Sequence, residues 1–161
     1  MTTSSTVESR LAELGLELPP VAAPVAAYVP AVVTGSWVHT SGQLPFVDGA
    51  LPATGKVSAS GAPGTVSPEQ ARELAAQAAL NAVAAVKDRV GDLDRVVRIV
   101  KVVGFVASDP AFTGQPSVIN GASELLGRIF GDAGVHARSA VGVAVLPLDA
   151  PVEVELVAEF R

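Results

Sequence analysis

The chain has 161 residues, of which 49% are hydrophobic and only 4% aromatic, so we expect one domain with a core of small aliphatic side chains. It contains no cysteine, which excludes disulfides, thiolate chemistry and cysteine-bound metals, and His39 and His136 are too few for a histidine-rich metal centre. The net charge of −5 disfavours general binding to nucleic acid or to acidic membranes.

The N-terminal segment carries no targeting or membrane signal. Its first ten residues are polar and lack the basic-then-apolar order of a signal peptide. The apolar run 21–33 is interrupted by Pro24 and Pro30 and is too short to span a bilayer. We therefore expect a cytoplasmic protein.

Apolar periodicity and the Gly and Pro positions predict alternating strands and helices. The predicted elements, in chain order, are a short helix over 7–14, a β-hairpin of 31–34 and 37–41, a mobile loop over 45–66, a helix over 67–91, a strand over 96–106, a helix over 118–130, a strand over 141–146 and a last strand from 152. The clearest helix start is Ser67-Pro68, because Ser67 can cap, Pro68 fits the first helical position and Gln70 completes a capping box.

One face of the predicted sheet lacks cover from its own chain. The strands 96–106 and 141–146 are apolar on both alternating faces, which is typical of strands buried on both sides. Two helices cover only one face, so we expect a homo-oligomer that closes into a ring. Arg95, Arg98 and Lys101 are the only basic grouping, and their spacing does not keep all three on one face, which favours solvated or interface positions.

An arginine and a glutamate near the C-terminus predict an anion site. Arg138 precedes the strand 141–146, and Glu153 lies on the next strand, after a turn at 147–151. A guanidinium is costly to bury without an anion, and its planar fork suits a carboxylate. If the two strands pair across the turn, Arg138 and Glu153 face one small cavity, which would suit a small carboxylic acid with an acid/base group beside it.

Three motifs in this order resemble the Rid/YjgF family of reactive-intermediate deaminases, also called L-PSP endoribonucleases. They are Thr40-Ser41-Gly42-Gln43-Leu44-Pro45, then Ala137-Arg138-Ser139, then Leu146-Pro147 followed by Val152-Glu153-Val154-Glu155. The match runs from about Tyr28 to Glu159 and resembles a longer branch of the family. On this basis, residues 1–27 are an N-terminal extension with a short helix, and 28–161 are a single Rid/YjgF-like domain.

The resemblance implies an α+β fold like that of bacillus-type chorismate mutase. This fold is a mixed β-sheet with two helices on one face, assembled as a homotrimer with a central barrel and with sites in the clefts between subunits. The implied activity is that of a 2-iminobutanoate/2-iminopropanoate-type deaminase, which hydrolyses reactive enamines and imines such as 2-aminoacrylate to 2-keto acids and ammonia. No metal or organic cofactor is implied.

The resemblance also implies site residues. Arg138 would bind the substrate carboxylate, and Glu153 would orient water or relay protons. The remaining pocket positions would be Tyr28, Ser41, Asn120 and the backbone N–H of Ala140. Ser123 departs from the family, which places a tyrosine three residues after the pocket asparagine, so we expect a wider or more polar pocket and carry over no substrate preference.

Other readings of these residues are kept open or rejected on their chemistry. We expect His39 and His136 to make structural hydrogen bonds and Glu155 to be solvated, and Ser41 has no nearby His–Asp pair to activate it as a nucleophile. The main alternative function is a non-catalytic trimer that binds small carboxylates. An endoribonuclease is disfavoured by the acidic balance and by the lack of a stacking-aromatic platform and of a histidine pair. Chorismate mutase activity rests on fold analogy alone.

Overall fold

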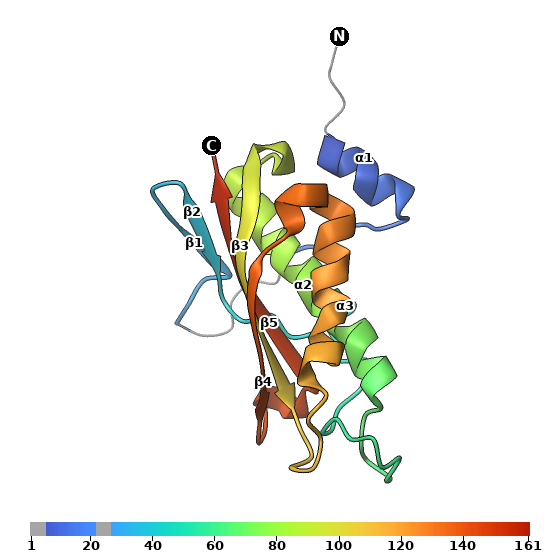
Figure 1. The fold of residues 1–161 in the computed structure, drawn as a ribbon. Coiled ribbons are helices and arrows are strands. Elements are labelled where there is room, and N and C mark those ends of the chain that lie inside the picture. Colours follow the sequence, from blue (N-terminus) through green and yellow to red (C-terminus); the bar gives the residue numbers. More distant parts are fainter. Residues whose placement is uncertain (1–5, 22–26) are drawn as a thin grey trace.

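Five strands form one mixed β-sheet in the order β1-β2-β5-β3-β4, in a computed structural model that describes residues 6–21 and 27–161 (Figure 1). The strands β3 and β4 run parallel, and the other neighbours run antiparallel. The elements are α1 (Thr6–Glu13), β1 (Ala31–Thr34), β2 (Trp37–Thr40), α2 (Pro68–Val90), β3 (Val96–Ala107), α3 (Gln115–Phe130), β4 (Ala137–Val143) and β5 (Val152–Phe160), with 3-10 turns at Leu93–Arg95, Gly131–Gly134 and Pro147–Asp149.

The predicted types and order of the elements are confirmed, and the bounds of two elements differ by more than one residue. The helix α3 begins at Gln115 rather than 118, because Pro116 suits its first turn. The strand β4 covers Ala137–Val143 rather than 141–146. Its last residue pairs with Ala107, the last residue of β3, so the residues after Val143 have no partner strand.

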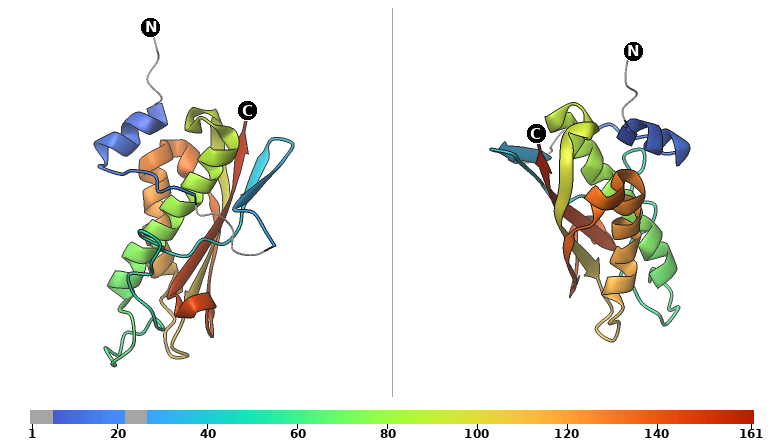
Figure 2. Two further views of the ribbon diagram at one scale, coloured as in Figure 1. Left: turned by 180° about the vertical axis from the view of Figure 1, so that it is seen from behind. Right: turned by 45° about the horizontal axis from the view of Figure 1, so that its top comes forward.

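The helices α2 and α3 lie side by side on one face of the sheet (Figure 2). The predicted cap of α2 is present, since the Ser67 hydroxyl accepts a hydrogen bond from the Gln70 backbone N–H at 3.1 Å. The alanine-rich helix α2 lets the layers approach closely, and Ala75, Ala78 and Ala82 are fully buried. The core between the helices and the sheet is thus built from small aliphatic side chains, as predicted.

The N-terminal helix α1 packs against this core. Val7 and Leu11 are buried in it. The carboxylate of Asp94 accepts hydrogen bonds from the backbone N–H groups of Thr6 and Val7 at 2.8 and 2.9 Å. This carboxylate satisfies amides of the first turn of α1, which have no partner within the helix.

The opposite face of the sheet carries no helix in the described parts of the chain. On this open face, Trp37 and Val141 are 40% and 44% exposed. Two irregularities in the β3–β5 register place Arg98 opposite Glu159 and Lys101 opposite Val157, so both cations lie on the open face. Strict alternation would have separated residues three apart, whereas the register shift between Ile99 and Lys101 brings these two cations to the same face. Arg95 lies in the turn before β3.

The predicted pairing of the two C-terminal strands is wrong. The strand β3 lies between β4 and β5, with Arg138 opposite Val102 on one edge and Glu153 opposite Phe105 on the other. The segment β3–α3–β4 is a parallel crossover unit, which places β4 beside β3, and β5 then returns along the other edge of β3. Val102 faces the helices and Phe105 faces away, so Arg138 and Glu153 lie on opposite faces of the sheet and do not share a cavity in one chain.

Candidate functional site

Arg138 is held against α3 by two hydrogen bonds from one nitrogen. Its Nη1 donates to Asn120 Oδ1 at 2.8 Å and to Ser123 Oγ at 3.2 Å. Asn120 and Ser123 are three residues apart and therefore lie on one side of the helix. Both N–H bonds of Nη1 are used, while Nε and Nη2 have no hydrogen-bond partner among the described residues. The edge formed by Nε and Nη2 is a bidentate donor suited to a carboxylate.

His136 contacts Ser123, one of the two acceptors of Arg138. Its Nε2 lies 2.9 Å from Ser123 Oγ, and its Nδ1 lies 2.6 Å from the Gly134 carbonyl oxygen. Both ring nitrogens are thus hydrogen-bonded, as expected for a structural histidine. We call Asn120, Ser123, His136 and Arg138 the Arg138 half-site. Ala140 lies on the same face of β4, two residues beyond Arg138.

Glu153 lies in a second cluster, on the open face of β5. Its carboxylate lies against Gly42, where an added Cβ would overlap Glu153 Oε1. The next residue, Gln43, pairs with Val154 through two backbone hydrogen bonds of 2.8 and 3.0 Å. The motif found in the sequence therefore follows β5 closely, and a side chain at position 42 would displace the Glu153 carboxylate. We call Ser41, Gly42, Gln43 and Glu153 the Glu153 half-site.

Ser41 and Tyr28 lie at the margin of the Glu153 half-site. The Ser41 hydroxyl donates to the Val29 carbonyl at 2.7 Å, and its backbone N–H donates to the Pro30 carbonyl at 2.8 Å. These bonds connect the motif to the segment that carries Tyr28, which is 54% exposed. The Ser41 hydroxyl is thus occupied by a backbone carbonyl rather than by an activating base.

The electrostatics of Glu153 differ from those of an ordinary surface glutamate. Burial raises the pKa of the Glu153 carboxyl, and the like charge of Glu155 raises it further. Glu155 lies two residues along β5 and on the same face, as the alternation predicted. Among the described residues, no hydrogen bond stabilises the Glu153 carboxylate. A carboxyl of this kind exchanges protons nearer to neutral pH than an ordinary one.

The chain therefore brings the predicted site residues together in two groups rather than one. Asn120 contacts Arg138, and the Ser41-Gly42-Gln43 motif adjoins Glu153, but the sheet separates the two half-sites. Sequence reasoning singled out Ser123 and His136 but missed their contact with each other and with the arginine. Their spacing gave no signal for it, because it depends on how α3 packs beside the start of β4.

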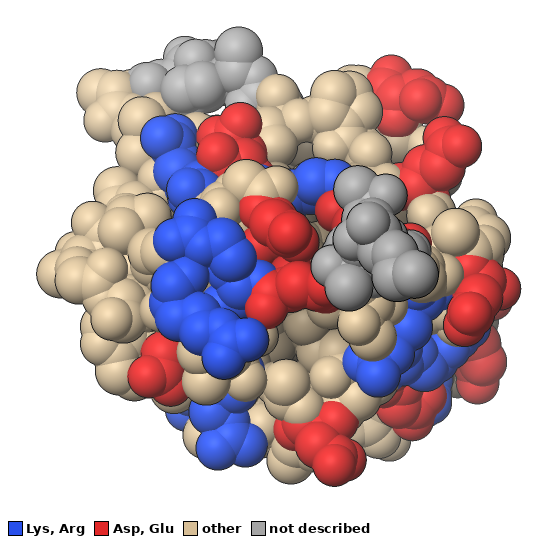
Figure 3. All heavy atoms as spheres, turned by 90° about the horizontal axis from the view of Figure 1, so that it is seen from above, with Lys and Arg blue, Asp and Glu red and all other residues tan. Residues whose placement is uncertain are grey.

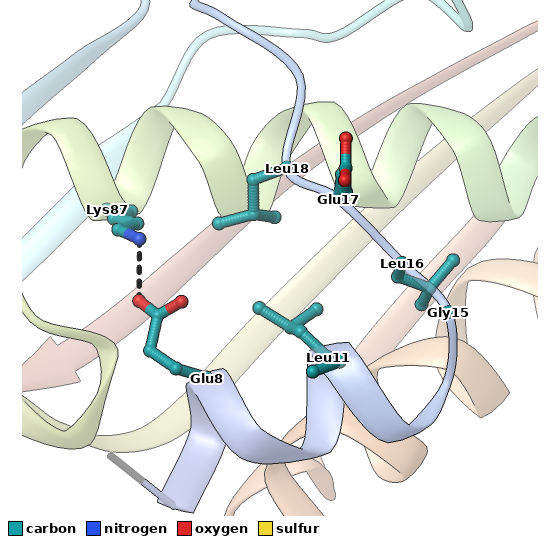
Figure 4. A pocket seen from close by; sticks show the side chains of 8 residues that line it. Glu8, Leu11, Gly15, Leu16, Glu17, Leu18 and Lys87 are labelled. Atoms are coloured by element: carbon teal, nitrogen blue, oxygen red, sulfur yellow. Dashed lines mark ion pairs between the residues drawn. The ribbon is translucent and has the colours of Figure 1, made fainter. Parts of the chain in front are cut away.

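Two cavities in the chain lie elsewhere. One of about 640 Å³ lies beside α1, and its lining includes the buried Leu11 and the ion pair of Glu8 with Lys87 at 2.6 Å (Figure 4). The other, of about 360 Å³, lies at the start of α2 and includes Ser58 and Gln70 in its lining. Neither cavity is lined by Arg138 or Glu153.

The charged surface at the end of the molecule seen in Figure 3 is mixed. Lys and Arg gather there in several patches, the largest of them left of centre, and Asp and Glu side chains lie beside these patches. In the described part of the chain, no three His, Cys, Asp or Glu side chains group closely enough to hold a metal ion. None of the helices within residues 6–21 and 27–161 has the length and hydropathy needed to cross a membrane.

The comparison with known families covers almost the whole chain. Residues 8–160 match the family described as "YjgF/chorismate mutase-like, putative endoribonuclease". The chain belongs to this family. The resemblance read from the three motifs is thereby confirmed, as is the chorismate-mutase-like mixed sheet with its helices.

Similar proteins of comparable length are known. Protein TCP17 of Trypanosoma cruzi is 46% identical over 159 residues, which cover 98% of this chain and 96% of the relative. The structure of Atu1372 from Agrobacterium tumefaciens, of unknown function, is 42% identical with a TM-score of 0.86, and covers 96% of this chain and 92% of that one. A structure from Shewanella oneidensis, named as an endoribonuclease, is 36% identical with a TM-score of 0.90, and covers 97% of this chain and 100% of that one.

A more distant structure contains a ligand. TdcF of E. coli, solved with bound serine, is 28% identical with a TM-score of 0.54, and covers 89% of this chain and 94% of that one.

Proposed function

We propose that this protein is a deaminase that hydrolyses reactive imines and enamines of small 2-amino acids to 2-keto acids and ammonia. The observation that carries the proposal is the orientation of Arg138, whose Nη1 is bound to α3 while its Nε–Nη2 edge stays open. Such an edge binds a carboxylate in two parallel hydrogen bonds and fixes its position. Membership of the YjgF family and the serine held by TdcF support this choice of ligand.

The complete site is proposed to form between subunits of a homotrimer. Arg138 and Glu153 lie on opposite faces of one sheet, so a second copy is needed to bring an arginine and a glutamate together. The exposed apolar residues of the open face, such as Trp37 and Val141, favour burial against another copy. In this arrangement the Arg138 half-site of one subunit faces the Glu153 half-site of its neighbour across the cleft.

The chemistry then needs only positioned groups and water. An enamine becomes an imine when its carbon gains a proton and its nitrogen loses one. Water then adds to the C=N carbon while the Glu153 carboxylate accepts a proton from this water and passes it to the nitrogen, which gives a carbinolamine. The carboxylate next transfers the remaining hydroxyl proton to the nitrogen, so the C–N bond breaks, ammonia leaves and the C=O bond forms. The reaction already proceeds in water, so orientation of the carboxylate, the water and the proton donor supplies the acceleration.

The test is an assay in which a PLP-dependent serine or threonine dehydratase supplies 2-aminoacrylate and keto acid release is followed. We expect acceleration by the wild-type protein and a loss of about 10²–10³-fold in Arg138→Ala, the scale of two charge-assisted hydrogen bonds. The control is Arg72→Ala, because Arg72 is an exposed arginine paired with Glu124. The proposal fails if the wild type does not accelerate the reaction, or if Arg138→Ala equals it.

The alternative is a trimer that binds small carboxylates without turnover. The serine bound to TdcF supports this alternative as much as it supports the deaminase, because a bound ligand shows binding and not turnover. Calorimetry with 2-oxobutyrate or benzoate separates the two proposals. Binding that depends on Arg138, together with no activity on imines, would support this alternative. An endoribonuclease would instead be supported by RNA cleavage that persists in Arg138→Ala and whose specific activity increases as the protein is purified.

A further inference from the structure

A chain of hydrogen bonds connects the Gly134 carbonyl through His136 and Ser123 to Arg138. The positions of its protons follow from the carbonyl at its first end. A carbonyl oxygen only accepts, so the contact between Gly134 O and His136 Nδ1 requires the proton on Nδ1. In the tautomer that carries its one proton on Nδ1, Nε2 is an acceptor, to which the Ser123 hydroxyl donates its single proton. The Ser123 oxygen is left as an acceptor for Arg138 Nη1.

The first end of this chain is fixed by packing. Gly134 is buried, and a Cβ at this position would overlap the Leu126 backbone carbonyl in α3. Ser123, His136 and Arg138 are each partly buried. The carbonyl that sets the protons is therefore part of the tightly packed turn between α3 and β4, and the arginine at the other end is the only charged member.

We propose that Ser123 and His136 are positioning residues that orient the Arg138 guanidinium toward the ligand's carboxylate. The proposal rests on the proposed function, because it concerns how the arginine binds that carboxylate. Without the acceptor on His136, the Ser123 hydroxyl rotates freely, and in some rotamers its proton points at Nη1 and repels it. The guanidinium then keeps only its bond to Asn120, and its Nε–Nη2 edge is less well directed.

A competing explanation is that His136 only ties down the turn before β4. Two substitutions separate the explanations by stereochemistry. In His136→Asn, the shorter amide reaches the position of Nδ1, so it preserves the bond to Gly134 and loses the bond to Ser123. In His136→Gln, the longer amide reaches the position of Nε2, so it preserves an acceptor for Ser123 and loses the bond to Gly134.

The experiment measures kcat and KM with 2-aminoacrylate, and the Kd of 2-oxobutyrate by calorimetry. We expect KM and Kd to rise about tenfold in His136→Asn and in Ser123→Ala, the scale of one hydrogen bond to a charged group, with kcat changed less than about twofold. His136→Gln and Ser123→Thr should restore values near those of the wild type. The double variant Ser123→Ala/His136→Asn should equal Ser123→Ala alone, because both changes break one chain.

The outcomes separate this inference from the proposed function. If His136→Gln is impaired and His136→Asn is not, or if the double variant adds the two losses, the positioning role is wrong. If Arg138→Ala abolishes binding while all Ser123 and His136 variants behave as the wild type, this inference fails and the proposed function stands. If the wild type neither turns over imines nor binds 2-oxobutyrate, both fail. Circular dichroism and thermal unfolding of each variant establish that it is folded.

Discussion

The two half-sites hold their charged residues in different ways. Arg138 is fixed by the hydrogen bonds that it donates to two side chains of α3. Glu153 instead lies against the backbone of Gly42, and its carboxylate has no hydrogen-bond partner among the described residues. The difference matches the two roles that we propose. A cation that binds a carboxylate gains from being oriented in advance, while a carboxyl that exchanges protons must not be paired, because pairing would lower its pKa.

The largest expected effect tests whether the half-sites act across subunits. Arg138→Ala and Glu153→Gln should each lose at least about 10²-fold in kcat/KM. When the two variants are mixed at equal amounts, unfolded and refolded together, activity should return to about one quarter of the wild-type value. The reason is that each half-site is intact with a probability of about one half when subunits assemble at random.

The control for this experiment mixes Arg138→Ala with the double variant Arg138→Ala/Glu153→Gln. No subunit in that mixture carries the arginine, so activity should stay at the level of Arg138→Ala. Recovery in the first mixture and none in the control supports a site shared between subunits. If the first mixture recovers no activity, although it refolds to assemblies of the wild-type size, Arg138 and Glu153 do not meet in that way.

The second prediction concerns the close contact that places Glu153. Gly42→Ala puts a methyl group where the Glu153 carboxylate lies, so the carboxylate must move. We expect a loss of about 10–10²-fold in kcat, because a misplaced acid/base group loses most of its contribution. Binding of 2-oxobutyrate should change much less than in Arg138→Ala, since the Arg138 half-site is untouched.

A matched glycine serves as the control. Gly127 lies inside α3, where an added Cβ meets nothing within 4 Å. Gly127→Ala should therefore retain activity and raise the free energy of unfolding by about 0.5–1 kcal/mol through helix propensity. If Gly42→Ala keeps the wild-type kcat, the close approach does not place a catalytic group.

The features that the sequence predicted correctly are local ones. Local signals, such as the Ser67-Pro68 cap and the apolar faces of α2 and α3, predicted the elements and their order correctly. The three motifs predicted the family, and the alternation along β5 placed Glu153 and Glu155 on one face. These features depend on neighbouring residues, which periodicity records directly.

The wrong strand pairing was a failure of non-local prediction. Adjacent strands in sequence usually pair in space, so a hairpin of β4 and β5 was the natural expectation, yet the parallel crossover through α3 places β3 between them. The register shift between Ile99 and Lys101 brings Arg98 and Lys101 to one face, which alternation alone does not predict, while Arg95 lies in the turn before the strand. The contacts of Ser123 and His136 with Arg138 likewise depend on how α3 packs beside β4, which no short motif encodes.

The third prediction uses the raised pKa of Glu153. As a proton acceptor it must be ionised, so kcat should rise with pH along a limb that lies above the ordinary range of a glutamate. Glu155→Gln removes the neighbouring like charge and should move this limb to lower pH, with kcat on the acidic side rising about two- to fivefold, the scale of one exposed charge interaction. Glu159→Gln, farther along β5 and not among the causes of the shift, is the control.

The same shift has a consequence for stability with a definite sign. Because folding raises the pKa of Glu153, the folded state binds its proton more tightly than the unfolded chain does. The stabilisation is complete below the ordinary pKa of a glutamate and is lost as the pH rises through the raised pKa of the folded protein. Urea unfolding across this range should show that the wild type loses free energy of unfolding relative to Glu153→Gln. If the difference in free energy of unfolding between the two proteins does not change with pH, Glu153 is not desolvated in the assembled protein. Its unpaired carboxyl, which distinguishes its half-site from that of Arg138, then no longer supports its role as a proton acceptor.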